Sequence, residues 1–255
     1  IGTLHATQVT SLVTLAQGRT DCISVIDLAP YNSTIGTVTN QASGYDTSYS
    51  ATYWQWLQTL DASTGQTVWE PASTYIPAVY AFTDASSDPW FAPEGLIRGA
   101  LGSVIRAERK LTSGNRDTLY EANVNPIATF PGSGVVVFGQ KTLQKKASAL
   151  DRVNVRRLLI SLKSYITQVS DNLVFEQNTI ATRNNFLSVV NPYLEGVQQR
   201  QGLYAFKVVM DDTNNTASTI DRNELVGQIF LQPTKTAEFV ILDFNVLPTG
   251  ATFPA

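Results

Sequence analysis

The segment from Asp88 to Leu101, DPWFAPEGLIRGAL, constrains the fold of this chain more than any other stretch. It surrounds a short apolar run with prolines, glycines and a tryptophan, and it contains no set of acid, base and nucleophile. Prolines fix φ and remove amide donors, glycines permit turns or close backbone approach, and large aromatic residues bury much area. The segment therefore predicts a structural scaffold, formed by Pro89, Trp90, Phe91, Pro93, Gly95 and Gly99.

The composition indicates a compact protein that makes contact with other proteins. The 255 residues allow one large domain or two closely packed ones. Hydrophobic residues make up 43% and charged residues only 15%, which argues against disorder. A surface with few ions suits protein contacts, because fewer charges must be desolvated. The net charge of −3 provides no general attraction to nucleic acid or membranes, and no apolar run approaches the roughly 20 residues of a membrane span.

The first half of the chain predicts an α/β fold, with a mixed sheet flanked by helices. Asp21–Ala29 is a short apolar run typical of a buried strand in a parallel sheet. Tyr53–Leu60 alternates like a strand and, across the turn residues Asp61–Gln66, predicts a hairpin with Thr67–Glu70. A helix is expected from Ile76 to Asp84, because it would place a proline in its first turn.

The middle of the chain is less regular. Mixed apolar and basic residues within Leu101–Leu119 favour a helix of modest length, and Asn123–Val137 indicates a turn-rich approach to a strand at Gly134–Phe138. A polar, lysine-bearing stretch follows and is interpreted as a domain seam. The predicted domains are residues 1–138 and 139–255.

Residues 150–169 predict the clearest helix. Apolar side chains follow the 3.6-residue period, whereas Arg152, Arg156 and Lys163 share the opposite face. Two interpretations stay open: an ordinary solvated face, or an electrostatic contact with an acidic partner to which Arg157 also contributes. A nucleic-acid surface is disfavoured, because it would need interleaved aromatic residues and a larger basic patch.

The remaining part predicts an α+β arrangement. A second helix is expected from Asn178 to Val190, ending before Pro192 because the residue preceding a proline disfavours helical geometry. Strands are expected at Leu203–Met210 and Leu225–Leu231, with a loop over residues 211–221.

Residues 238–246 predict a last strand that is apolar on both sides. Such a strand could pair with an exposed sheet edge of another chain through main-chain hydrogen bonds. The alternative is an internal strand with a frayed end. The residues of this predicted inter-subunit arm are Glu238, Val240, Leu242, Phe244 and Val246.

Nothing in the sequence specifies an active site. His5 is the only histidine and no G-x-S-x-G motif accompanies it, while the neighbouring Asp211 and Asp212 should diverge. The glycines at 132 and 134 precede a strand, whereas phosphate loops follow one.

Asp27 could hold a cation at a strand end, although a cap or turn role is favoured. With one cysteine and one histidine the chain cannot form an internal disulfide or a Cys/His zinc site. We therefore expect no enzymatic activity, no cofactor and no metal.

Six separated segments, in order, resemble the contractile tail sheath proteins of bacteriophages. They are DPWFAPEGLIRGAL, which includes Arg98, NPIATFPGSGVVVFGQKTL, DRVNVRRLLISLKSYI, VFEQN, DDTNNTASTID and AEFVILDF. The resemblance extends over Asp21 to Phe244. It departs from the family pattern at Glu94, where alanine is common, and at Ser133, where a basic residue is common.

The resemblance implies a non-enzymatic protomer that stacks in helical rings around a tail tube and contracts to drive the tube through the host envelope. It implies a degenerate subtilisin-like domain without catalytic residues, followed by a C-terminal sheath domain nearest the tube. The arm at 238–246 would add a strand to a neighbouring subunit, and the helix at 151–167 would contact the tube. Expected partners are other sheath subunits, the tube protein, the baseplate and the tail terminator, in a virion component made in the host cytoplasm.

The sequence begins at Ile1 and not at methionine, which we interpret as a fragment or processed product that is itself monomeric. Two alternatives remain at this point. One is a degenerate α/β hydrolase-like protein, and the other is a receptor-binding or adhesive phage structural module.

Overall fold

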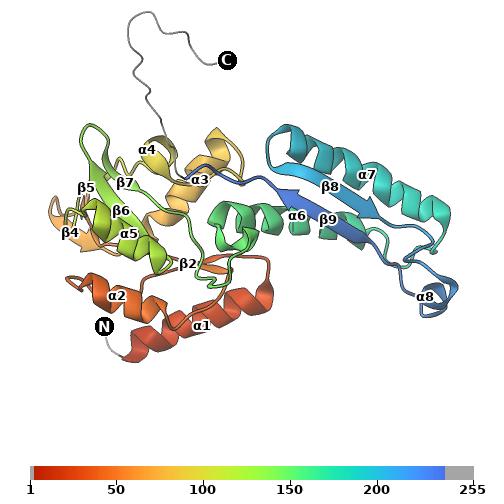
Figure 1. Cartoon of the computed structure of the whole chain (residues 1–255), viewed down its shortest axis with the longest axis horizontal. Coiled ribbons are helices and arrows are strands. Elements are labelled where there is room, and N and C mark those ends of the chain that lie inside the picture. Colours follow the sequence, from red (N-terminus) through yellow and green to blue (C-terminus); the bar gives the residue numbers. More distant parts are fainter. Residues whose placement is uncertain (1–2, 239–255) are drawn as a thin grey trace, which may run out of the picture.

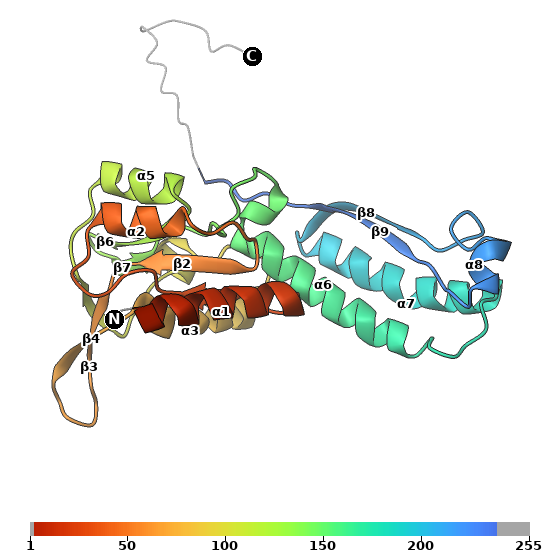
Figure 2. The same ribbon diagram turned by 90° about the horizontal axis from the view of Figure 1, so that it is seen from below.

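The computed structural model describes residues 3–238 and shows an elongated molecule with two parts (Figures 1 and 2). The first part contains the sheets and helices up to β7, on the left in Figure 1. The second part contains α7, α8 and the β8–β9 hairpin, on the right, and the long helix α6 leads into it.

A four-stranded sheet with the order β1-β2-β6-β7 forms the centre of the first part. Its strands are β1 (Ser24–Ile26), β2 (Ser50–Trp54), β6 (Val124–Phe130) and β7 (Gly134–Val137). β1, β2 and β6 are parallel and β7 is antiparallel, so the predicted mixed sheet and its first buried strand are confirmed. The side chains of β2 alternate between two cores, because Tyr53 packs in one buried cluster and Trp54 in the other.

Helices supply the rest of both cores. One cluster includes α3 (Ile76–Ser86), which has Pro77 in its first turn as predicted, preceded by the 3₁₀ turn η1 (Ala72–Thr74). The other cluster draws its helical residues from three elements. They are α1 (Thr3–Arg19), α2 (Ile35–Ala42) and α5 (Ser113–Glu121).

A smaller sheet with the order β4-β3-β5 projects from the first part. Its strands are β3 (Leu57–Leu60), β4 (Thr67–Glu70) and β5 (Val104–Ala107). The hairpin of β3 and β4 is confirmed, but the single strand predicted over Tyr53–Leu60 is wrong, because its first residues belong to β2 in the larger sheet. Hydrogen bonds from Ser63 and Thr64 lower the pKa of Asp61 in the hairpin turn to about 2. The helix predicted within 101–119 is wrong, because this stretch forms β5 and then α5. Pairing of β5 with β3, in which Arg106 Nε donates to Gln58 Oε1 at 2.6 Å, outweighs the weak helical pattern.

The turn-rich approach predicted over 123–137 is also wrong. β6 occupies most of it, and the turn is confined to residues 131–133, where Gly132 has φ 80°. Pro126 is tolerated inside β6 because it lies where the pairing with β2 ends, opposite Trp54. Its carbonyl still accepts a 2.9 Å bond from Phe138 N.

The second part packs two helices against an antiparallel hairpin. Its elements are α6 (Val153–Asp171), α7 (Ile180–Gln199), β8 (Leu203–Val209), α8 (Ala217–Asp221) and β9 (Gln228–Pro233). The helix α6 and the strand β8 are confirmed, and β9 begins three residues later than predicted. The loop predicted over 211–221 is partly wrong, because α8 occupies its second half behind the cap of Thr216.

The end predicted for α7 is wrong, because the helix continues through Pro192 to Gln199. A proline inside a helix costs about 3 kcal/mol. Burial of Val190, Leu194 and Val197, all at 0% exposure, offsets that cost by fixing this helix in the core.

The division predicted at 138/139 stays a prediction. Residues just beyond it remain with the first part, since Leu143 N donates to Ser50 O at 2.9 Å and the Leu143 side chain is buried beside β2 and α5.

Candidate functional site

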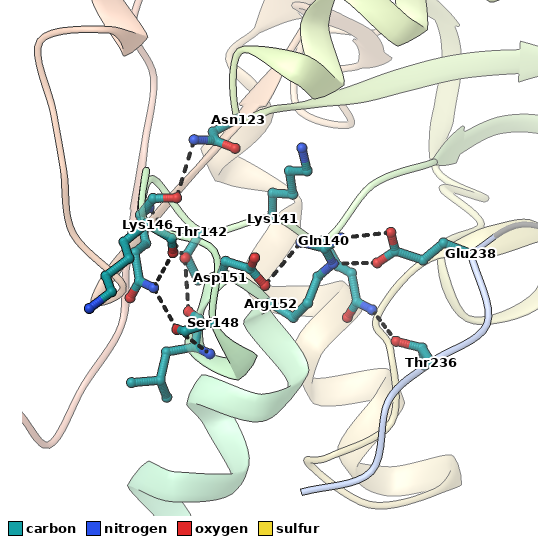
Figure 3. A network of polar contacts seen from close by, with 12 residues as sticks. Asn123, Gln140, Lys141, Thr142, Lys146, Ser148, Asp151, Arg152, Thr236 and Glu238 are labelled. Carbon is teal, nitrogen blue, oxygen red and sulfur yellow. Dashed lines mark hydrogen bonds and ion pairs between the residues drawn. The ribbon is translucent and has the colours of Figure 1, made fainter.

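The described chain ends at a salt bridge that joins the start of α6 to the root of the predicted arm (Figure 3). Arg152, the residue before α6, donates from Nε and Nη2 to the two carboxylate oxygens of Glu238, with an Nη2–Oε2 distance of 2.9 Å. Its Nη1 lies 3.0 Å from Asp151 Oδ1. The side chains of Arg152 and Glu238 are 26% and 13% exposed, so the bidentate pair is largely shielded from water.

Further hydrogen bonds hold the residues that lead to Glu238. Gln140, which is fully buried, donates from Nε2 to Thr236 Oγ1 at 2.7 Å. Thr234 Oγ1 donates to Gln201 O at 2.7 Å. We call Gln140, Arg152, Thr236 and Glu238 the arm-root clamp, because together they hold the last described residues against the body.

The loop before α6 positions Arg152. Val153 N donates to Gln140 O at 2.7 Å, and Thr142 N donates to Asp151 O at 2.9 Å. The 3₁₀ turn η2 (Ala149–Asp151) is capped by Ser148, which also accepts a 2.6 Å bond from Gln144 Nε2 (Figure 3). Backbone pairing therefore places Gln140 and Arg152 side by side.

Burial shapes the electrostatics around the clamp. Burial, followed by repulsion from Glu238, raises the pKa of Glu94 to about 7. The same two causes raise the pKa of Tyr120 far above its usual value. Burial lowers the pKa of Lys141, whose Nζ donates to Tyr120 O at 2.8 Å. The clamp thus lies in a poorly solvated environment where added charge has strong effects.

The arginines of α6 do not form an exposed basic surface. Arg156 is 6% exposed, donates to Ser48 Oγ and stacks 3.9 Å from the Tyr49 ring centroid. Burial lowers its pKa. The same face therefore packs against the first part of the molecule.

The other two members of the basic set also contact the first part. Arg157 pairs with Asp84 at 2.6 Å and lies 4.5 Å from the Tyr80 ring centroid. Lys163 is exposed and donates to Thr20 Oγ1. Of the predicted tube-facing residues, Arg152, Arg156 and Arg157 are engaged within the chain and Lys163 is exposed, and the tube-facing role of this set stays a prediction.

The segment DPWFAPEGLIRGAL joins the two parts. Trp90 packs in the core of the second part, and its Nε1 donates to Arg200 O at 2.9 Å. Its carbonyl accepts a 3.0 Å bond from Asn154 of α6. Pro89 O lies 3.5 Å from Arg157 Nη1, and Pro93 is buried two residues before α4 (Gly95–Arg98).

Both glycines of this segment are required by the backbone. Gly95 has φ 86°, which disfavours other residues. A Cβ at Gly99 would lie 2.6 Å from Val137 O, because the two backbones are bonded here through Val137 N and Gly99 O at 2.8 Å. Arg98 Nε donates to Ala92 O at 2.8 Å and closes the turn.

Sequence reasoning missed the features at the far end of the second part. Phe175 is fully exposed with φ 73°, and Val174 and Ile180 beside it are 58% and 62% exposed. The two apolar residues that begin the VFEQN segment are visible in the sequence. The sequence around them does not tell whether their side chains are buried or exposed. The arm residues Val240, Leu242, Phe244 and Val246 lie outside the described residues.

The residues considered for catalysis are used structurally. Asp27 accepts hydrogen bonds from Ser73 N and Ser73 Oγ, so its carboxylate holds the 3₁₀ turn η1. Asp211 accepts from Thr213 N at 2.9 Å within a turn, while Asp212 pairs with Arg183. Within residues 3–238 no group of three or more His, Cys, Asp or Glu side chains could hold a metal, and no helix is long and apolar enough to cross a membrane.

Comparison with solved structures supports a sheath fold. The sheath of an extracellular contractile injection system in the contracted state is 27% identical with a TM-score of 0.77, covering 87% of this chain and 63% of that one. The baseplate structure of the anti-feeding prophage in its contracted state matches at 20% identity with a TM-score of 0.80, covering 94% and 64% of the two chains. The mixed α/β fold is confirmed, whereas the subtilisin-like character of residues 1–138 stays a prediction.

Sequence comparison identifies the family. Residues 145–247 match the phage tail sheath C-terminal domain. The tail sheath protein of Vibrio phage KVP40 is 42% identical over 185 residues, which are 72% of this chain and 28% of that protein. The tail sheath protein of Enterobacteria phage T4 is 34% identical over 230 residues, which are 90% of this chain and 35% of that protein. The chain thus spans about a third of the length of these relatives. It is a member of the phage tail sheath family and contains the family's C-terminal domain.

Proposed function

We propose that this chain is part of a non-catalytic subunit that polymerises into a contractile sheath around a tail tube, and that repacking of subunit interfaces drives the tube through the host envelope. The arm-root clamp supports this proposal. A set of contacts that anchors the base of the predicted arm is expected where the arm links one subunit to another. Contraction would then move nearly rigid subunits while their linking arms hold.

The β8–β9 hairpin supplies a matching acceptor for an arm. Within the described residues this sheet has two strands, so each strand presents one unpaired edge. Two-stranded sheets gain stability from further strands, and exposed edges are templates for strand addition. We assign one of these two unpaired edges to the arm of a neighbouring subunit.

Contact with the tube is assigned to the apolar end around Phe175, in place of the arginines of α6. A fully exposed phenylalanine held in a left-handed conformation gains burial only in a complex. Arg156 and Arg157 pair within the chain, which supports the apolar end over them as the contact. The baseplate and the tail terminator would meet the same subunits at the two ends of the sheath, in a virion component made in the host cytoplasm.

Electron microscopy of the parent protein tests the arm. Removal of residues 239–255 keeps Glu238 and therefore the clamp, and we expect folded subunits that build no tubes. Deletion of residues 1–2 is the control for shortening the protein away from the arm. Sheaths of normal length from the variant lacking 239–255 would refute the assigned role of the arm.

Co-assembly with the tube protein tests the contact at the far end. Phe175→Ser should reduce the number of tubes that carry a sheath, because it removes an apolar anchor and leaves the core unchanged. Leu60→Ser is the control, since Leu60 is 56% exposed on the small sheet of the first part. Equal losses with the two variants would contradict a specific role for Phe175.

A further inference from the structure

Glu94 lies beside the arm-root clamp, because its side chain and that of Glu238 line the same cavity. It precedes α4 with an extended backbone, and its side chain does not cap that helix. It lines a cavity of about 490 Å³ together with Arg98, Tyr120 and Glu238. Within residues 3–238 its carboxyl group makes no hydrogen bond or ion pair. A shielded acid without a partner therefore stands next to the anchor of the arm.

Charged and titratable groups reach Glu94 from every element around it. Arg152 at the start of α6 and Arg98 of α4 attract its carboxylate, whereas Glu238 repels it. Tyr120 of α5 and the buried Tyr53 of β2 also interact with its charge. Arg116 and Asp117 of α5 line the same cavity with opposite charges.

Arg152 already spends its bidentate pair of donors on one carboxylate and faces a second with its remaining nitrogen. Its Nε and Nη2 bind Glu238 and its Nη1 faces Asp151. Arg98 uses Nε for Ala92 O and lies over the Phe91 ring at 5.5 Å. An ionised Glu94 repels Glu238 across the shared cavity and competes with it for the charge of Arg152, and both effects weaken the clamp.

We propose that Glu94 is a charge switch for the arm-root clamp: its neutral form leaves the Arg152–Glu238 pair intact, and its ionised form releases the segment 234–238 from the body. The regulated step is departure of the arm from its own subunit, so the inference rests on the proposed function for its biological meaning. Its physical test needs only the isolated chain, so a failed test is distinguishable from a failure of sheath assembly.

The surroundings of Glu94 also determine whether a rise in pH opens or closes the clamp. Burial, reinforced by Glu238, raises the pKa of Glu94 to about 7. Below this value Glu94 is mostly neutral and the clamp is closed. Above it the carboxylate forms, so a rise in pH favours release.

Trypsin cleavage after Lys235 reports release, because Lys235 is exposed within the held segment and cleavage requires that segment to leave the body. The rate is compared among the wild type, Glu94→Gln and Glu94→Ala at pH about 6 and about 8. At the higher pH the wild type should be cut about three- to tenfold faster than either variant, and at the lower pH the rates should converge. Comparison at equal pH removes the protease's own pH dependence.

A second measurement needs no variant. Lys110 is exposed in the loop before α5, and the ratio of cleavage at Lys235 to cleavage at Lys110 in the wild type should rise between the two pH values. A ratio that stays constant, or a wild type and Glu94→Gln that differ equally at both pH values, would overturn the switch. Full-length sheath assembly by either variant has no bearing on that result.

Discussion

Arg152 and Glu238 are 86 residues apart in the sequence, and their side chains form one bidentate salt bridge at the point where the arm begins. Arg152 is also held by Asp151 and by the backbone pairing that starts α6. The start of α6 and the root of the arm are therefore held together by one largely shielded ion pair. This coupling links the long helix between the two parts to the proposed connection between subunits.

Glu238→Ala should lower the free energy of unfolding by about 1–3 kcal/mol, because it leaves Arg152 partly buried without its main partner. Urea unfolding measures the change. Glu195→Ala, at an exposed position of α7, is the control and should stay within about 0.5 kcal/mol of the wild type. Equal effects of the two substitutions would show that the clamp contributes nothing to stability.

Local patterns were sufficient for the elements whose burial follows one period. The parallel strand β1, the hairpin of β3 and β4, the proline-started α3 and the amphipathic α6 were all predicted from such patterns. Prediction failed where tertiary contacts outweigh local preference. Pairing with β3 makes a strand of Val104–Ala107, and core burial carries α7 through Pro192.

Arg156→Glu should destabilise the fold by about 3–5 kcal/mol, because it places a carboxylate against Ser48 and the Tyr49 ring where an arginine is buried. Lys163→Glu, on the exposed part of the same helix, should cost less than about 1 kcal/mol. Thermal and urea unfolding of the two variants test the difference. Two equally stable variants would restore the interpretation of a solvated basic face.

The placement of the arginines shows what helical periodicity leaves undetermined. The period correctly groups Arg152, Arg156 and Lys163, yet it does not tell what covers that group. Ser48 and Tyr49, which cover Arg156, lie more than 100 positions earlier in the chain. The role of Glu238 was likewise inaccessible, because its partner is identified only by the fold.

Gly99→Ala should destabilise the protein by about 2–4 kcal/mol, since the new Cβ would lie 2.6 Å from Val137 O and 2.8 Å from Gly95 O. Both atoms belong to the backbone and cannot move aside easily. Gly114→Ala is a matched control, because nothing lies within 4 Å of its Cβ position in α5. The control should be neutral or stabilising by up to about 1 kcal/mol. A tolerated Gly99→Ala would show that β7 and the DPWFAPEGLIRGAL segment are not held in close contact.

Glu94 should make the stability of the wild type fall as pH rises. Its pKa is raised to about 7 in the folded state, mainly by burial, so folding binds a proton that the unfolded chain has already released. The stabilisation is complete below about pH 4.5 and is lost progressively up to about pH 7, by ~2–3 kcal/mol in all, with no further loss above that. Glu94→Gln lacks this titration, so the difference in unfolding free energy between wild type and variant should change by that amount across the window. Urea unfolding at a series of pH values measures it, and curves that run parallel from pH about 4.5 to about 8 would mean that Glu94 is not shielded as the structure shows.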